Sequence, residues 1–176
     1  MILTRTPLDG VFAVTAAPHA DESGHFARTY CAETFARHGL APVGVQCNTS
    51  FNPHRGTLRG MHYQDRPRPD PKLVRCTRGR IFDVAVDIRP DSPSYCRWFG
   101  IELSAEAGNA LYVPPGCAHG FITLEESSEV FYMMGETFVS ELARGVRWND
   151  SAFAIVWPLE PVRLAPRDAG YADFQP

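Results

Sequence analysis

The sequence lacks a long apolar run: its first ten residues, MILTRTPLDG, offer only a short apolar start before Thr4 and Arg5. Such a start is too short for the core of a signal peptide or for a membrane span. The sequence also lacks a basic block, and its net charge is −3. This charge pattern argues against a nucleic acid or an anionic membrane as partner. We therefore expect a cytoplasmic protein that acts on a small molecule.

Cysteine pairs of the C-x-x-C type are also missing, and the five cysteines are odd in number and widely spaced. This pattern indicates reduced structural thiols and argues against a disulfide framework or a zinc site. The chain has no internal repeat, low-complexity tract or linker. Its 176 residues with 44% hydrophobic content suit one compact core. We expect a single domain over residues 1–176.

What the sequence does contain is a series of short strand patterns separated by glycine and proline. The clearest is RIFDVAVDI, residues 80–88, where an apolar row starting at Phe82 alternates with a row that carries Asp83 and Asp87. Similar segments lie at 10–15, 25–30, 43–50, 57–64, 72–79, 97–104, 109–114, 119–124, 128–134 and 154–157. About a dozen short strands is the inventory of an all-β jelly-roll sandwich or barrel.

Helical patterns are few. In residues 31–40, Phe35 can face inward and Gly39 can end a helix, and residues 139–145 offer a second helical turn. The proline-rich stretch DRPRPDP, residues 65–71, predicts a short loop over the mouth of a cavity. The expected fold is thus all-β with a few short helical segments.

Metal-binding jelly rolls, the metal cupins, need an H-x-H pair, a carboxylate and a later histidine around the ion. The pair is missing here, because His62 is followed by Tyr63 and Gln64. The later histidine is present as His119 in PPGCAHGF, but one histidine cannot complete the ligand shell. We expect no bound metal and no other cofactor.

Five blocks follow one another along the chain: GTLRGMHYQ, KLVRCTRGRIFDVAVDIRPDSPSY, VPPGCAHGF, EVFY and RGVRWNDSAFAIVWP. In this order they resemble the dTDP-4-dehydrorhamnose 3,5-epimerase family, and the resemblance runs from about residue 8 to residue 169. It implies a cupin-type jelly roll, a homodimer, no metal, and an isomerase. The implied reaction is epimerisation of a nucleotide-linked 4-keto-6-deoxyhexose in deoxysugar or polysaccharide biosynthesis.

The chemistry of such a sugar explains the catalytic residue types. Carbons C3 and C5 flank the C4 ketone, so a base can remove either proton if the enolate oxygen is stabilised. Inversion then needs a proton from the opposite face. The resemblance implies His62 as the base and Asp168 as the carboxylate that orients it. It implies Lys72 as the cation near the enolate oxygen and Tyr132 as the opposite proton donor.

Substrate-binding residues are assigned by the same resemblance. Arg59 and His119 match positions at the diphosphate and the sugar, where a guanidinium suits phosphate oxygens. A bulge or twist at Gly60 would let Arg59 and His62 both reach the cavity. The other matched binding positions are Gln46, Asn48, Phe138, Arg28, Ser23 and Arg167.

Several of these positions depart from the family pattern. Ser23 stands where an arginine reaches the nucleotide sugar from the partner subunit, and Arg28 stands where a glutamate contacts the base. Phe138 replaces a tyrosine that stacks on thymine, Ala143 replaces a binding glutamate, and Arg167 replaces a lysine. We hypothesise that the chemistry is kept and the nucleotide changed, because an arginine side chain at position 28 has the donor geometry to recognise guanine or cytosine.

Alternatives remain open at three points. Inversion can take place at C3, at C5 or at both, and the enzyme can be a single-site epimerase or ketoisomerase for a sugar linked to a nucleotide other than dTDP. The third alternative is a cupin that binds a nucleotide sugar without turning it over. Tyr132 together with His62 argues against that, since a binder needs no opposed acid and base. For the dimer, Phe26 and Tyr30 on one face of residues 25–30 are compatible with strand exchange between subunits.

Overall fold

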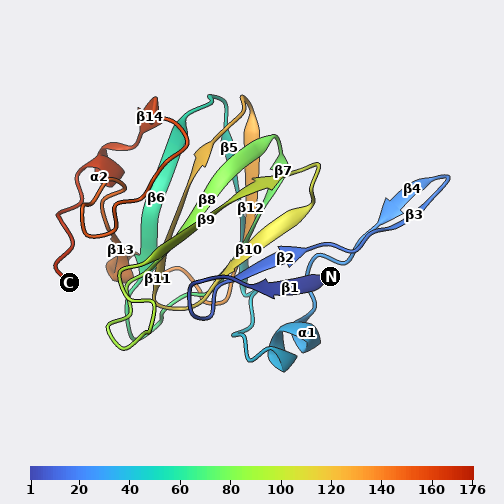
Figure 1. The fold of residues 1–176 in the computed structure, drawn as a ribbon, viewed down its shortest axis with the longest axis horizontal. Helices are drawn as coiled ribbons and strands as arrows, with labels where there is room; N and C mark the ends of the chain where they lie inside the picture. Colours follow the sequence, from blue (N-terminus) through green and yellow to red (C-terminus); the bar gives the residue numbers. More distant parts are fainter.

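Two β-sheets pack face to face in the computed structural model, which describes all 176 residues (Figure 1). The first sheet contains, in spatial order, β1 (Ile2–Arg5), β2 (Phe12–Thr15), β10 (Asn109–Val113), β7 (Lys72–Arg78), β12 (Ser128–Met134) and β5 (Gln46–Asn52). The second contains β13 (Ala143–Gly145), β6 (Thr57–Gln64), β11 (Cys117–Thr123), β8 (Arg80–Asp87) and β9 (Trp98–Ser104), with β14 (Arg163–Leu164) beside β6. The all-β sandwich predicted from the sequence is confirmed.

The remaining elements are short. They are the hairpin strands β3 (His19–Asp21) and β4 (Gly24–Phe26), the helices α1 (Ala32–Arg37) and α2 (Pro166–Ala169), and the 3-10 turn η1 (Ser140–Leu142). No helix among them has the length and apolar character needed to cross a bilayer.

Strand β8 shows how the layers are filled, because both of its faces are buried. Ile81 and Ala85 belong to the core between the two sheets. The other row, with Val84 and Val86, lies beneath the C-terminal segment and packs with Phe153. The wholly apolar row of β8 therefore packs against the C-terminal segment, on the outer face of the second sheet. The row that carries the two aspartates faces the space between the two sheets.

Helix α1 covers the outer face of the first sheet. Phe35 is fully buried and makes edge-to-face contacts with Tyr112 and Tyr30, at centroid distances of 5.5 and 4.9 Å. The helix ends at Arg37, and Gly39, the predicted terminating residue, follows the cap with φ +71°. The N–H groups of Gly39 and Leu40 donate to the carbonyls of Ala36 and Phe35, the bonding pattern of a Schellman cap.

The strand predicted over residues 25–30 is wrong beyond Phe26. Strand β4 ends at Phe26, and Tyr30 packs against Phe35 of its own chain. Phe26 and Tyr30 therefore do not share a strand face, because the chain leaves the strand to bury the tyrosine beside α1.

Two further predictions are corrected by the C-terminal third of the chain. Residues 154–157 form no strand, and Ile155 and Trp157 instead pack on the outer face of the second sheet. The predicted helical turn over residues 139–145 holds only for η1, after which β13 pairs with β6. Apolar residues in a segment that covers a sheet give the same sequence pattern as apolar residues in a strand. The pattern therefore did not distinguish the two backbone conformations.

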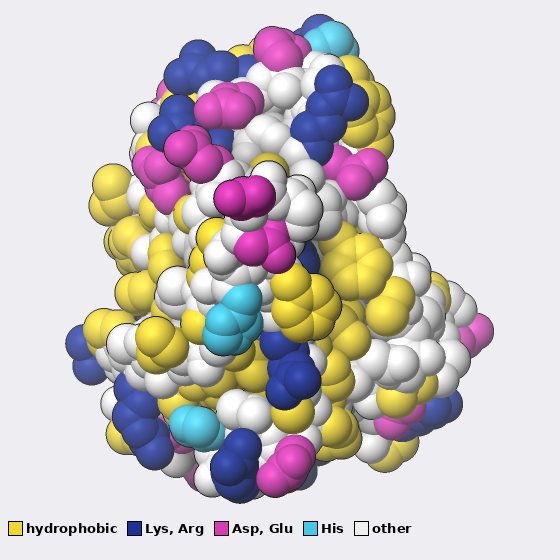
Figure 2. All heavy atoms as spheres, turned by 90° about the vertical axis from the view of Figure 1, so that its right-hand side faces the viewer, with side chains coloured by type: hydrophobic (Ala, Val, Ile, Leu, Met, Phe, Trp, Pro, Cys, Tyr) yellow, Lys and Arg dark blue, Asp and Glu magenta, His cyan; other side chains and the backbone are white.

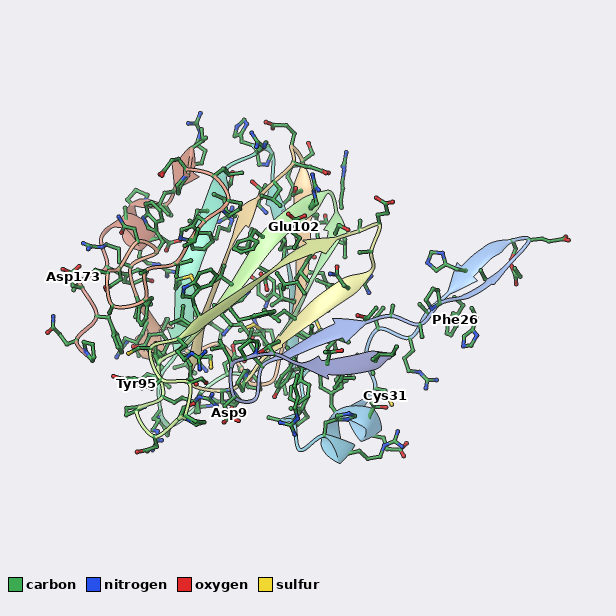
Figure 3. All side chains as sticks on the ribbon, in the orientation of Figure 1. Asp9, Phe26, Cys31, Tyr95, Glu102 and Asp173 are labelled. Carbon is green, nitrogen blue, oxygen red and sulfur yellow. The ribbon has the colours of Figure 1, made fainter.

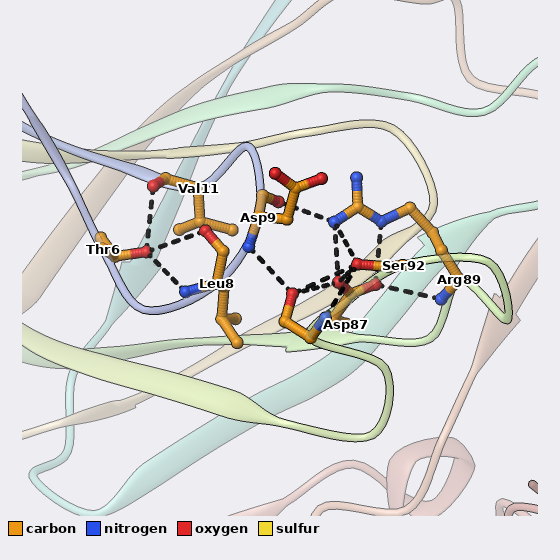
Figure 4. A network of polar contacts seen from close by, with 8 residues as sticks. Thr6, Leu8, Asp9, Val11, Asp87, Arg89 and Ser92 are labelled. Carbon is orange, nitrogen blue, oxygen red and sulfur yellow. Dashed lines mark hydrogen bonds and ion pairs between the residues drawn. The ribbon is translucent and has the colours of Figure 1, made fainter.

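A buried carboxylate at the end of β8 ties the N-terminal turn to the sandwich (Figure 4). Asp87 accepts hydrogen bonds from Arg89 at 2.7 and 2.8 Å and from the Ser94 hydroxyl at 2.6 Å. Arg89 and Ser94 also hold the backbone of Asp9, at 2.7 and 2.9 Å. Burial alone would raise the pKa of Asp87, but the donors around it hold the pKa below its usual value. The carboxylate therefore stays ionised and joins residues 6–11 to the loop after β8.

The β3–β4 hairpin projects away from the two sheets (Figure 1). Phe26, labelled on this arm in Figure 3, has 71% of its surface exposed. In the view from the side to which the arm points, charged side chains of both signs lie among hydrophobic ones (Figure 2). The arm thus carries a large aromatic ring that its own chain leaves uncovered.

Candidate active site

A cavity of about 290 Å³ lies between the two sheets. Side chains from β6 and β11 form one wall, and side chains from β5, β7 and β12 form the other. The lining contains one carboxylate, Asp70, against three arginines and one lysine: Arg59, Arg144, Arg167 and Lys72. This charge balance suits an anionic ligand.

Strand β6 brings two predicted site residues to the cavity through a bulge. In a regular strand, residues three apart point to opposite faces. Here Arg59 pairs with Phe121 and His62 with His119, so three steps along β6 match two along β11. The extra residue is the bulge that the sequence predicted, and it lets Arg59 and His62 line the same cavity.

Gly60 lies within this bulge, and no larger residue fits there. Its φ is +135°, and a Cβ at this position would stand 2.5 Å from the Cα of Gly120. Its N–H also donates to Oδ2 of Asp168, at 3.1 Å. The bulge thus connects the end of the chain to β6.

His62 is held by the carboxylate of Asp168, with 2.7 Å between Nε2 and Oδ1. Burial alone would raise the pKa of Asp168, but the hydrogen bond and charge of His62, the N–H of Gly60 and the charge of Arg167 together keep the pKa below its usual value. An ionised Asp168 accepts a hydrogen bond, so the neutral imidazole carries its proton on Nε2. Nδ1 is then left to take a proton.

Tyr132 enters the cavity from the opposite sheet. It lies on β12, paired with Asn48 of β5 and Val74 of β7, whereas His62 lies on β6. Burial raises the pKa of Tyr132, and the nearby charge of Arg59 opposes this rise. The phenol is therefore neutral near pH 7 and has a proton to donate.

Lys72 opens β7 and forms an ion pair inside the cavity. Its Nζ lies 3.1 Å from Oδ2 of Asp70, and the two side chains are only 9% and 1% exposed. Oδ1 of Asp70 accepts the N–H of Gly135 at 3.2 Å. Burial raises the pKa of Asp70, while the charge of Lys72 opposes the rise.

His119 forms a second histidine–carboxylate pair beside the first. Its Nε2 lies 2.8 Å from Oδ1 of the fully buried Asp83, and its backbone is the cross-strand neighbour of His62. Burial raises the pKa of Asp83, and His119 opposes the rise. Each histidine thus has its own carboxylate, and no group of three or more His, Cys, Asp or Glu side chains is placed to hold a metal ion.

The predicted binding residues Arg59 and Phe138 line the cavity, and hydrogen bonds link Gln46 and Asn48 of β5 to Phe138. Nε of Arg59 donates to Oδ1 of Asn52 at 2.7 Å, which orients the guanidinium. Phe138 lines the cavity and donates its N–H to Oε1 of Gln46 at 3.1 Å. Gln46 in turn donates to Asn48 at 3.4 Å. Gln46 and Asn48 do not line the cavity themselves.

Like Gln46 and Asn48, the predicted binding residues Ser23 and Arg28 are absent from the cavity lining. Ser23 lies in the turn of the projecting hairpin, where its hydroxyl donates to Asp21 at 2.6 Å. Arg28 is exposed in the segment that follows β4. Within one chain, neither is placed to touch a ligand bound between the sheets.

The sequence profile of the family described as dTDP-4-dehydrorhamnose 3,5-epimerase matches residues 5–175, which is nearly the whole chain. The chain belongs to this family. The resemblance read from the five sequence blocks is therefore confirmed, and with it the jelly-roll sandwich of the dTDP-4-dehydrorhamnose 3,5-epimerases.

Members of the epimerase family with different reaction names resemble this chain. The dTDP-4-dehydrorhamnose 3,5-epimerase of Methanothermobacter thermautotrophicus is 42% identical over 158 residues, which cover 90% of this chain and 84% of the relative. The dTDP-4-dehydrorhamnose 3-epimerase of Streptomyces niveus is 35% identical over 162 residues, which cover 92% and 78%. The crystal structure of the 3,5-epimerase from Bacillus anthracis, with TDP and PPi bound, superimposes with a TM-score of 0.93 at 33% identity, covering 98% of this chain and 99% of that one.

The site residues predicted from the sequence do not include two charged residues of the cavity lining, Asp70 and Arg144, or Asp83, the buried partner of His119. Asp83 stands in a largely apolar strand, and a charge at such a position is a signal of a buried partner. Asp70 stands in the proline-rich stretch of residues 65–71, whose sequence predicts only a loop. Arg144 lies in a predicted helical turn that the structure replaces with β13.

Proposed function

We propose that this epimerase inverts C3 and C5 of a dTDP-linked 4-keto-6-deoxyhexose through His62, Tyr132 and Lys72. One observation carries the proposal: His62 and Tyr132 belong to different sheets and line one cavity, which Lys72 shares. A base and an acid on opposite walls suit a reaction that removes a proton from one face of a ring and returns one to the other.

His62 acts as the base at the carbon next to the ketone. Nδ1 takes the proton from C3 or C5, and Asp168 stabilises the imidazolium that results. The electron pair of the broken C–H bond forms the enolate, whose negative charge rests on the C4 oxygen. Lys72 offers its ammonium group to that oxygen.

Tyr132 completes the inversion. Its phenol donates a proton to the opposite face of the same carbon, and the ketone forms again. Tyr132 then regains a proton from solvent, and His62 loses its proton to solvent, so the enzyme returns to its starting state without a cofactor.

The cationic lining supports a diphosphate sugar as the substrate. Arg59 is oriented by Asn52, and Arg144 and Arg167 stand at the same cavity. Guanidinium groups pair with phosphate oxygens through two parallel hydrogen bonds. The Bacillus anthracis relative, which has TDP bound, supports a thymidine nucleotide for this chain as well.

We also propose that the chain works as a homodimer in the cytoplasm. The hairpin projects from the sandwich and leaves Phe26 exposed, and Ser23 in its turn is absent from the lining of the chain's own cavity. A second copy that receives this arm would bury the aromatic ring and bring Ser23 and Arg28 to a nucleotide. A monomeric mass in solution would contradict this arrangement.

The regiochemistry can be tested by deuterium exchange. We expect the protein in heavy water to exchange the protons of a dTDP-linked 4-keto-6-deoxyhexose at both C3 and C5, because one base serves whichever carbon faces it. Proton NMR that follows each carbon separately measures both rates. Exchange at C3 alone would favour a single-site 3-epimerase, which is the activity that the Streptomyces niveus relative is named for. Absence of exchange with any keto sugar would favour a binding protein.

The identity of the nucleotide needs a separate measurement. We expect dTDP to bind more tightly than CDP, UDP or GDP in calorimetric titrations, since the family relatives carry dTDP in their names. Tightest binding by GDP or CDP would instead support the hypothesis that Arg28 has changed the base that the enzyme recognises. An Arg28→Glu variant would then shift the preference back toward dTDP.

A further inference from the structure

The cavity contains one acidic side chain, and it touches the cation on which the proposed reaction depends. Asp70 lies 3.1 Å from Nζ of Lys72, and both side chains are almost completely buried. Apart from this ion pair, Oδ2 of Asp70 has no partner. Oδ1 accepts the N–H of Gly135. The carboxylate therefore has Lys72 as its sole counter-charge.

A buried carboxylate is costly unless a strong partner compensates it. The loop that carries Asp70 is also braced on its neighbours. Gln64, at the end of β6, donates to the carbonyls of Arg68 and Thr137 at 2.7 and 3.2 Å, and it accepts the N–H of Val139 at 2.8 Å. These bonds join the loop to the segment after β12. Asp70 is thus a fixed group rather than the tip of a free loop.

Lys72 gains from such a neighbour. Its backbone is fixed in β7, between Val113 of β10 and Met134 of β12. Its side chain has four rotatable bonds, so an ammonium without a partner would occupy many positions. The ammonium has three N–H donors, so one directed at Asp70 leaves two for a ligand in the cavity.

We propose that Asp70 is a positioning residue that holds the ammonium of Lys72 at the cavity wall where the enolate oxygen forms. The inference rests on the proposed role of Lys72. Asp70 itself does not touch the reacting carbon, so it acts on the rate through Lys72. Its removal should lower the turnover number and leave substrate binding, which depends on the arginines, nearly unchanged.

A double-mutant cycle tests the proposal with the full-length protein. Deuterium exchange into the dTDP-linked 4-keto-6-deoxyhexose is measured for wild type, Asp70→Asn, Lys72→Met and the double variant. We expect Asp70→Asn, which keeps the shape of the side chain, to lower kcat roughly 10- to 100-fold through a displaced ammonium, with KM within about twofold. In the Lys72→Met background, Asp70→Asn should have no further effect.

Each contrary result has its own meaning. Equal losses from Asp70→Asn with and without Lys72 would show a general structural effect and overturn the inference. Unchanged kcat in Asp70→Asn, with a large loss in Lys72→Met, would overturn it while leaving the proposed function intact. Full activity of Lys72→Met would overturn the role of Lys72 and the inference with it.

Asp87→Asn is the matched control, because it also removes a buried carboxylate beside a cation but lies outside the cavity lining. It should lower thermal stability and leave kcat unchanged.

Discussion

Replacement of His62 by asparagine abolishes deuterium exchange at both C3 and C5 of the keto sugar. Loss of a general base typically lowers a rate by about 10²- to 10⁴-fold, and we expect the exchange rate to fall by an amount near the upper end of this range. Asparagine retains a polar side chain but has no group that takes a proton near neutral pH. Exchange is followed by proton NMR in heavy water, where loss of the C–H signal reports proton removal directly.

The same measurement separates the base from the rest of the cavity. Asp168 keeps the N–H of Gly60 and the nearby guanidinium of Arg167, so His62→Asn should remain folded in thermal unfolding. His54→Asn is the control, since His54 is an exposed histidine outside the cavity lining. Substantial exchange in His62→Asn would show that another group removes the proton, and His119 with Asp83 would be the next candidate.

Replacement of Tyr132 by phenylalanine uncouples exchange from inversion. Without the phenol, no group on the opposite wall donates a proton, and inversion should fall by about 10²- to 10⁴-fold. His62 still removes the proton and returns a deuteron to the face from which the proton came. We therefore expect deuterium at C3 and C5 with the starting configuration retained, as measured by NMR coupling constants of the product.

Burial of Tyr132 is part of this argument. It raises the pKa of the phenol, so the wild-type side chain keeps its proton through neutral and mildly alkaline pH. Phenylalanine fills the same space, so the cavity keeps its shape. Tyr95→Phe, which removes a hydroxyl outside the cavity lining, should behave as wild type. Normal inversion by Tyr132→Phe would mean that water or another residue delivers the proton.

Much of the strand layout was predictable from the sequence. The segments 57–64 and 128–134 form strands with the predicted bounds, and 72–79 and 80–88 are each one residue shorter. In these segments glycine or a polar turn residue stands where the chain must reverse, so the ends are marked locally. Residues 154–157 have an equally apolar pattern, yet they form no strand, because they lie over a sheet instead of pairing with an edge.

The residues of the candidate site divide in a similar way. Ordered blocks along the chain pointed to His62, Lys72, Tyr132 and Asp168, and the structure brings the first three to one cavity with Asp168 behind His62. The sequence also pointed to the bulge at Gly60, because arginine and histidine three residues apart need one to reach the same side. It had no means of pairing Asp70 with Lys72, since a proline-rich loop carries no periodicity from which a direction can be read.

The sequence by itself determined the fold class, the family and the chemical types of the groups in the cavity, because these depend on local patterns and on the order of motifs. The tertiary structure alone decided which face of β8 looks inward and which carboxylate serves which cation. It also decided that the hairpin stands clear of the cavity of its own chain. A two-residue alternation marks two faces without saying which is covered by the other sheet, and that choice is made by contacts between residues far apart in the chain.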